Sequence, residues 1–455
     1  MIRNFLIRLA GAALAVLAGG IVYLLVAPPE VLRVADAYAA KIVCSNVFIA
    51  GRDADETLAV DVQAPGHPLL RLARIRVDRG EGVVTARLFG LFATGTAIHR
   101  PGLGCATVPD GDVGAARRVQ LTQAPALAPP GAAMWPAGGQ VATVATPALA
   151  DIFATAALTG PGMRAIVVVK DGKLVAEAYG TGFNGDTPLL GWSMTKTVNA
   201  ALLARAMAAA GVGFDVAGLF PQWAGDERAA IRLADLLSMT SGLAFNEDYG
   251  DVSDVNRMLF LEPDMAAFAV SRPAVAAPGE VFSYSSGTAI LLSRLWMSWL
   301  GDDTGALAYP RTALFGPLGM TSAVLEADAA GTLAGSSYMY ATARDWARFG
   351  LFLLQDGVWN GERLLPEGFV ALMQTSNRKP GGYSQAQSWV LGPLESDGAP
   401  SAGLPLDSFW MLGHDGQSIA IIPSAGLVVV RLGLTPSALG YGPEALVRAV
   451  LDATR

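Results

Sequence analysis

A serine and a lysine lie three residues apart in the stretch GWSMTKTVN, directly before the Ala/Leu-rich run ALLARAMAAAG. That run predicts a helix, and residues three apart on a helix share a face, so the side chains of Ser193 and Lys196 can meet. A serine hydroxyl becomes a good nucleophile when an adjacent base takes its proton, and a desolvated lysine can be that base. The free N–H groups at a helix N-terminus also stabilise developing oxyanion charge. The spacing therefore suits attack of a serine on a carbonyl carbon.

The same pair has a structural alternative, in which Ser193 caps the helix and Lys196 is a solvated first-turn cation. Two further segments bear on the choice. PGEVFSYSSGTAILLSRL carries Tyr284 two residues before Ser286, at the start of another predicted helix. GHDGQSIAIIP places His414 directly before a predicted strand. A buried core phenol and a plain turn residue are the structural alternatives for Tyr284 and His414.

The order Ser-x-x-Lys, Tyr-x-Asn/Ser and Lys/His-x-Gly resembles the class C branch of the serine β-lactamase and penicillin-binding-protein superfamily. The segment GSSYMYATARDWARFGLFLLQDG and the GHDGQ turn are most similar to its 6-aminohexanoate-dimer hydrolase-like and esterase members. The resemblance covers roughly residues 145–455. It implies a serine hydrolase that acts through an acyl-enzyme on an amide, an ester or a short peptide, without a cofactor.

The resemblance also implies roles for individual residues. Ser193 would be the acylated nucleophile, Lys196 would help to deprotonate it, and Tyr284 would carry protons between nucleophile, leaving group and water. Backbone N–H groups of Ser193 and Gln417 would form the oxyanion hole. Ser286 would contact the substrate, as would the third-motif residues His414, Asp415 and Gly416.

Two of these positions depart from the family pattern. Ser286 stands where the lactamases usually carry Asn, and His414 stands where they usually carry Lys. The first change removes an amide donor and the second weakens a fixed positive charge for a substrate carboxylate. Glycine is expected at Gly416 because substrate would lie against the strand backbone. We therefore expect an amidase or esterase; a D-Ala-D-Ala carboxypeptidase and a non-hydrolytic cell-wall peptide sensor are the alternatives.

The N-terminus predicts a single membrane-spanning helix. Arg3 and Arg8 are followed by no charged residue until Glu30, and about 20 apolar residues suffice to cross a bilayer. The positive-inside tendency then places the remaining chain outside the cytoplasm. We expect a bacterial inner-membrane anchor with a periplasmic catalytic domain. Secretion after cleavage of a signal peptide, near the Ala-Tyr-Ala sequence 37–39, is the alternative.

The two cysteines follow the expected anchor, in an oxidising compartment. An even count there permits one bridge. We expect a disulfide between Cys44 and Cys105; two small buried thiols are the alternative.

The chain divides by composition into four parts. Residues 1–30 are the anchor, and residues 31–120 are a small β-rich region in which RIRVD and VVTARLFG flank the turn RGEG as in a hairpin. Residues 121–143 are a linker rich in Pro, Gly and Ala. Residues 144–455 are the hydrolase domain.

Strand-like segments lie at both ends of that last part, and mostly helical patterns lie between them. AIVVV and LVAEAYG come early, whereas FWMLG, SIAIIP and LVVVRLG come late. This order predicts an α/β (α+β) fold of the β-lactamase/transpeptidase type, with one antiparallel sheet built from both ends of the domain and a helical subdomain beside it.

Other classes of function receive no support. The net charge of −7 gives no electrostatic reason to bind nucleic acid. The three histidines lack metal-binding spacing, so no metal site is expected. The polar loop Asn246–Tyr249 is left without a role, although loops there can line a cleft.

Overall fold

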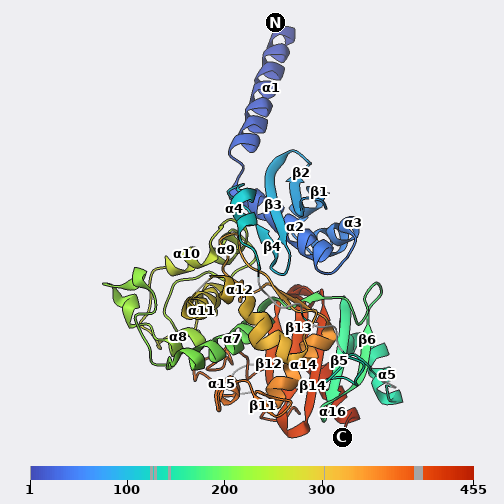
Figure 1. The fold of residues 1–455 in the computed structure, drawn as a ribbon. Coiled ribbons are helices and arrows are strands. Elements are labelled where there is room, and N and C mark those ends of the chain that lie inside the picture. The colour runs from blue at the N-terminus through green and yellow to red at the C-terminus, as the bar shows by residue number, and fades with distance from the viewer. Residues whose placement is uncertain (1, 123–126, 128–130, 142–144, 302, 394–402) are drawn as a thin grey trace.

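The computed structural model describes residues 2–122, 127, 131–141, 145–301, 303–393 and 403–455. Its largest sheet has five strands drawn from distant parts of the chain (Figure 1). Neighbours pair antiparallel in the order β12 (Phe409–Gly413), β13 (Gln417–Ile422), β14 (Leu427–Gly433), β5 (Met163–Lys170) and β6 (Lys173–Tyr179). The expected sheet from both ends of the domain is confirmed.

Helices cover both faces of this sheet, which explains why its central strands are apolar on both sides. α14 (Ala343–Leu354) lies on one face, where Gly350 approaches so closely that a Cβ there would lie 2.6 Å from Val428 Cγ1. α5 (Pro147–Ala154) and α16 (Glu444–Ala453) pack on the other face (Figure 1). The sheet is thus a fixed platform on which β12 forms one edge.

A helical subdomain lies beside the sheet, as expected (Figure 1). Its two central helices, α7 (Thr195–Ala210) and α11 (Ser286–Trp299), pack around the buried side chain of Asn199. That amide donates to the Ala289 carbonyl at 2.9 Å and accepts from Trp296 Nε1 at 2.8 Å. These bonds fix the two helices whose first residues carry the Ser-x-x-Lys and Tyr-x-Ser motifs. The other helices of the subdomain are α8 (Leu233–Leu237), α9 (Asp254–Phe260), α10 (Met265–Val270), α12 (Asp303–Tyr309) and α15 (Phe369–Gln374).

Residues 30–118, here called the N-terminal unit, contain an antiparallel sheet. The predicted hairpin is present, and the strands run in the order β1 (Ala73–Asp78), β2 (Val83–Leu88), β3 (Phe92–Arg100) and β4 (Gly104–Thr107). The structure adds a long helix, α2 (Glu30–Phe48), which the sequence analysis did not predict. α2 is buried on nearly every face from residue 36 to residue 47, including Asp36 and Lys41, so it lacks the polar stripe of a surface helix.

The predicted disulfide is present and joins this helix to the sheet. Cys44 of α2 bonds to Cys105 of β4, with their Cα atoms 6.1 Å apart. The bridge closes a long loop and holds α2 against β4.

Beside the disulfide, a buried polar cluster fastens the N-terminal unit to the remainder of the chain. The carboxylate of Glu326 accepts hydrogen bonds from Lys41 Nζ at 2.5 Å, Ser45 Oγ at 2.8 Å and the Cys105 backbone N–H at 2.6 Å. All four side chains are buried. Because a buried carboxylate without partners would be costly, these bonds select one arrangement of the two parts.

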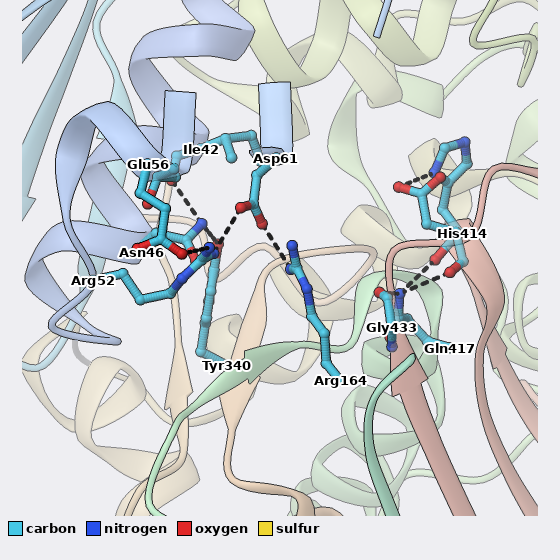
Figure 2. A network of polar contacts seen from close by, with 12 residues as sticks. Ile42, Asn46, Arg52, Glu56, Asp61, Arg164, Tyr340, His414, Gln417 and Gly433 are labelled. Carbon is cyan, nitrogen blue, oxygen red and sulfur yellow. Dashed lines mark hydrogen bonds and ion pairs between the residues drawn. The ribbon is translucent and has the colours of Figure 1, made fainter. Parts of the chain in front are cut away.

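A second polar cluster crosses the same boundary nearer the large sheet (Figure 2). Asp61 of the N-terminal unit forms ion pairs with Arg164 of β5 at 2.7 Å and with Arg52 at 2.8 Å. Arg52 also donates to Asn46 of α2 at 3.0 Å. The two clusters hold the N-terminal unit against the part of the chain that contains the large sheet.

The first helix, α1 (Ile2–Val26), is long and apolar enough to cross a membrane, and none of its residues is buried. It projects away from the rest of the chain (Figure 1). A membrane span and a signal sequence share these properties. Of the expected linker, the described residues 131–141 include Trp135, which is buried, while much of 121–143 lies outside the described residues.

Candidate active site

Ser193 lies in a short 3₁₀ turn, η3 (Trp192–Met194), that leads directly into α7. The turn is held in place by β7 (Leu189–Leu190), which pairs with β9 (Met339–Ala341). Trp192 has a φ of +47°, an uncommon backbone conformation for a bulky residue. Such strained positions cluster at functional sites, where the surrounding packing maintains them.

Lys196 occupies the first turn of α7 and is 1 % exposed. Its Nζ donates to Ser193 Oγ at 3.0 Å, to Ser286 Oγ at 3.0 Å and to the Ser336 carbonyl at 2.9 Å. Burial lowers the pKa of Lys196 to about 8, although the nearby carboxylate of Glu247 opposes the shift. A solvated cation is therefore excluded, and the ammonium group has a low enough pKa to lose its proton near neutral pH.

Tyr284 lies immediately before α11, with its ring beside the lysine. Lys196 Nζ is 4.7 Å from the ring centroid. Rings of Tyr383 and Trp389 enclose the other sides, at centroid distances of 5.6 and 5.3 Å. Burial raises the pKa of Tyr284 above its ordinary value, Glu247 raises it further, and a hydrogen bond with Ser193 opposes the rise. The phenol is thus neutral under ordinary conditions, within reach of the serine hydroxyl.

The structure also brings a carboxylate into the site. Glu247 Oε2 accepts from the Ser286 backbone N–H at 2.8 Å, and Glu247 Oε1 accepts from Ser286 Oγ at 2.5 Å. Tyr249 donates its hydroxyl to the same carboxylate at 3.3 Å. Sequence reasoning left this loop without a role, because nothing in NEDY marks which side chain turns inward. The replacement of Asn by Ser286 was the available signal, since a shorter side chain leaves space for another polar group.

The third motif forms the turn between β12 and β13. His414 Nδ1 lies 3.0 Å from Asp415 Oδ2, and 42 % of the His414 side chain is exposed. Burial opposes protonation of this imidazole, but the hydrogen bond and charge of Asp415 prevail, so the pKa of His414 lies above its usual value. Its ring contacts those of Trp192 and Tyr249, at centroid distances of 5.7 and 5.0 Å. His414 therefore lies at the site, next to the residue that precedes the serine.

Gly416 ends this turn and Gln417 follows it; Gly416 is partly buried and Gln417 is buried. Gln417 donates its side-chain amide to the Gly433 carbonyl at 2.6 Å, and Gly433 N–H returns a bond of 2.9 Å (Figure 2). Gly416 has a φ of +77°, and a Cβ there would lie 2.8 Å from Arg431 Nη1. Glycine is thus required at 416 by the left-handed backbone and by Arg431, which differs from the expected reason, a close approach of substrate.

A glycine from another element, Gly413, the last residue of the edge strand β12, lies against the serine turn. A Cβ on Gly413 would lie 2.2 Å from the carbonyl oxygen of Gly191. The backbone of β12 therefore passes directly alongside the turn that carries Ser193.

A cavity of about 330 Å³ opens beside these residues. Trp192, Tyr249 and His414 line one side of it. The residues that line the other side come from α2 and from the turn η2 (Pro68–Leu72) of the N-terminal unit. Among the described residues, no cluster of three or more His, Cys, Asp or Glu side chains has the arrangement of a metal site.

The beta-lactamase family model matches residues 154–438, more than half of the chain. The chain belongs to the beta-lactamase family. Solved structures with the same fold include a penicillin-binding protein homologue from Caulobacter crescentus, at 18% identity and a TM-score of 0.55, covering 70% of this chain and 100% of that one. A candidate 6-aminohexanoate-dimer hydrolase from Bacillus anthracis is 22% identical with a TM-score of 0.53, covering 64% of this chain and 79% of that one. The fold of this beta-lactamase family member is therefore one that serine hydrolases use.

A relative among curated proteins matches over a shorter span. An uncharacterized protein of Alkalihalophilus pseudofirmus is 30% identical over 99 residues, which are 20% of this chain and 29% of that protein. The beta-lactamase family member thus spans less than a third of the length of this relative.

Proposed function

We propose that the protein is a membrane-anchored serine hydrolase that cleaves esters or linear amides through an acyl-enzyme. The observation that carries the proposal is the buried Lys196, whose Nζ lies 3.0 Å from Ser193 Oγ and whose pKa burial lowers to about 8. The packing of a buried lysine does not require it to contact a partly exposed serine. A general base, by contrast, must contact the hydroxyl group whose proton it removes.

The reaction begins with a neutral Lys196. Its Nζ takes the proton of Ser193 Oγ as that oxygen attacks the substrate carbonyl carbon, which gives a tetrahedral oxyanion. The Ser193 backbone N–H is one donor to this oxyanion. Gln417 N–H, as the family resemblance implies, and Gly413 N–H, on the strand beside Gly191, are the two candidates for the second donor.

Collapse of the oxyanion breaks the bond to the leaving group and leaves Ser193 acylated. Tyr284 donates its phenolic proton to the leaving alcohol or amine and recovers one from Lys196. Water then attacks the acyl carbonyl and passes its proton to the same pair, which frees the acid and regenerates Ser193 Oγ–H. No net proton or electron is required beyond those of water and substrate.

The site favours neutral substrates over penicillins. A penicillin carries a carboxylate, and the family's usual lysine for that group is His414 here, already paired with Asp415. The family's usual Asn is Ser286, whose hydroxyl is occupied by Glu247. Both groups that would recognise a β-lactam are therefore replaced or occupied.

The proposal includes α1 as an uncleaved anchor with its N-terminus in the cytoplasm. Cleavage near Ala39 would cut through the middle of the buried helix α2 and would separate Asp36 from the Leu88 N–H that it binds at 3.0 Å. Alkaline phosphatase fused after Arg455 should be active, because that enzyme needs export, and the intact chain should sediment with membranes. A soluble mature chain that begins within α2 would refute the anchor.

The enzymatic part is tested with purified full-length protein in lipid nanodiscs. A fluorophosphonate probe should label the wild type at Ser193 and should not label Ser193→Ala. The same protein should turn over p-nitrophenyl acetate repeatedly. A stable acyl adduct without turnover would instead identify a sensor, and no labelling would reject the proposal.

A further inference from the structure

We infer that the N-terminal unit completes the substrate site, and that the cavity between this unit and the side chains of Trp192, Tyr249 and His414 holds the acyl chain of an amphiphilic ester. This inference deepens the proposed hydrolase function and rests on it for the identity of the reaction. It concerns a part of the chain outside the matched family region of 154–438.

The cavity is bounded by both parts of the protein. Trp192, Tyr249 and His414 come from the catalytic side, and Val34 and Leu69 come from the N-terminal unit. A volume of about 330 Å³ falls within the range of roughly 300–1,000 Å³ that is usual for small-molecule sites. Ser193 itself does not line the cavity, but the rings of Trp192 and His414 do, and their centroids lie 5.7 Å apart beside the serine turn. A substrate whose carbonyl lies at Ser193 would extend past these two rings into the cavity.

The wall from the N-terminal unit is mostly apolar, and its polar side chains are those of Tyr38 and His67. Its residues are Val31, Val34, Ala35 and Tyr38 of α2, with Pro65, Gly66, His67, Leu69 and Leu70 from the segment that follows. The complete set of lining residues contains no lysine and no arginine, and its charged carboxylates are those of Asp251 and Asp415. Such a surface gains free energy by burying methylene groups and offers no ammonium or guanidinium group to an anionic substrate.

The apolar wall also lies close in sequence to the membrane-spanning segment. Three residues separate the end of α1 at Val26 from the start of α2 at Glu30. The first residue of α2 is fixed to the hydrolase domain, since Glu30 forms an ion pair with Arg257 of α9. Val31 lines the cavity directly after that anchor point. When α1 spans a bilayer, this end of the cavity lies near the bilayer surface, where amphiphilic esters are concentrated.

The wall is rigid enough to select among substrates. α2 is tied down by the Cys44–Cys105 disulfide and by the bonds of Lys41 and Ser45 to Glu326. A fixed apolar wall gives chain-length preference, because each methylene that it buries strengthens binding about fourfold.

The test fills the cavity from the N-terminal side. Ala35→Phe places a ring in the cavity, and Leu69→Asp places a charge on its wall. The matched control is Val60→Phe, which places the same aromatic ring in the N-terminal unit at a position that is 43 % exposed and does not line the cavity. Full-length proteins in nanodiscs are compared for kcat/KM on p-nitrophenyl octanoate and acetate, with thermal unfolding as the check on folding.

The expected wild-type ratio of octanoate to acetate kcat/KM is at least ten. Ala35→Phe and Leu69→Asp should each lower this ratio tenfold or more, and Val60→Phe should leave it within twofold of the wild type. Equal losses on both esters, or an unchanged ratio in the two cavity variants, would overturn the inference while leaving the hydrolase proposal intact.

A binding measurement distinguishes the proposed acyl-chain site from the proposed hydrolase activity, because it does not depend on catalysis. Calorimetric titration of the neutral amide octanamide into Ser193→Ala should show binding that Ala35→Phe in the same background weakens at least tenfold. If wild-type protein hydrolyses no ester but octanamide binds in this way, the hydrolase proposal fails and the acyl-chain site stands. If Ser193→Ala shows no more octanamide binding than Ser193→Ala with Ala35→Phe, the acyl-chain site is rejected.

Discussion

The hydroxyl of Ser286 donates to Glu247 Oε1 at 2.5 Å and accepts from Lys196 Nζ at 3.0 Å. The side chain of Ser286 therefore connects the carboxylate of Glu247, which lies in a loop, to the buried ammonium group of Lys196 on α7. The carboxylate raises the pKa of Lys196 against the effect of burial, so the two influences together set the pH at which the lysine becomes a base.

Loss of the nucleophile should abolish turnover without unfolding the protein. Ser193→Ala is expected to lower kcat on p-nitrophenyl acetate by a factor on the order of 10³ or more, and Tyr284→Phe should be nearly as damaging, because groups in one proton-transfer unit act together. The free energy of unfolding should change by about 1 kcal/mol or less on removal of the partly exposed hydroxyl. Near-normal ester turnover by Ser193→Ala would contradict the mechanism.

The rate should depend on pH through Lys196. The lysine acts as a base only when neutral, so kcat/KM should rise with pH and level off above an apparent pKa of about 8. Lys196→Arg should remove this limb along with the activity, because a guanidinium keeps its proton. A profile that is flat from pH 6 to pH 10 would exclude lysine as the titrating base.

Glu247→Gln should move the same limb to lower pH. Removal of the negative charge withdraws the influence that raises the pKa of Lys196, so that burial among the described residues lowers it further. Asp248→Asn is the matched control, since it removes an exposed carboxylate from the same loop. Equal shifts in both variants would show that the loop's overall charge, rather than the Glu247 contact, controls the titration.

The parts of the fold predicted from sequence are those with local signals. The run AIVVV and the late segments SIAIIP and LVVVRLG have the β-branched composition of buried strands, and all three pair in one antiparallel sheet as expected. Ser193, Lys196 and Tyr284 come together because two helix starts face each other across Asn199. The resemblance of the three ordered motifs to the superfamily predicted this meeting, whereas the Ser-x-x-Lys spacing alone suits a helix cap equally well.

The parts that sequence did not predict depend on long-range contacts. The sequence of α2 shows no clear helical pattern, because its charged residue Lys41 is buried against Glu326, which lies far away in the chain. Glu247 was left aside because its role depends on Ser286, 39 positions later. Both cases concern polar groups whose partners lie elsewhere, and periodicity within a segment carries no information about them.

Breaking the buried cluster between the two parts of the chain should destabilise the protein strongly. Lys41→Met leaves Glu326 buried without its ammonium partner, which costs about 3–5 kcal/mol. The matched control is Arg117→Met, which removes the partner of Glu81 in an exposed pair and should cost about 1 kcal/mol or less. Denaturant unfolding of both full-length variants gives the comparison. Similar free energies of unfolding would mean that Glu326 does not fasten the N-terminal unit.

The final prediction concerns the choice of substrate. Wild-type protein should hydrolyse p-nitrophenyl esters far better than nitrocefin, whose carboxylate finds no lysine or arginine among the residues that line the cavity. The double variant His414→Lys/Asp415→Asn supplies the family's ammonium group and removes the carboxylate that would otherwise pair with it; asparagine also tolerates the φ of +59° at position 415. Its nitrocefin-to-ester ratio of kcat/KM should rise roughly tenfold, the effect of about 1.5 kcal/mol from one charged hydrogen bond. His67→Lys adds the same charge on the opposite cavity wall and should leave the ratio nearly unchanged, because the ammonium must lie beside the serine turn to meet the carboxylate of an acylating β-lactam. Efficient nitrocefin hydrolysis by the wild type, or an equal gain in both variants, would contradict this account of substrate choice.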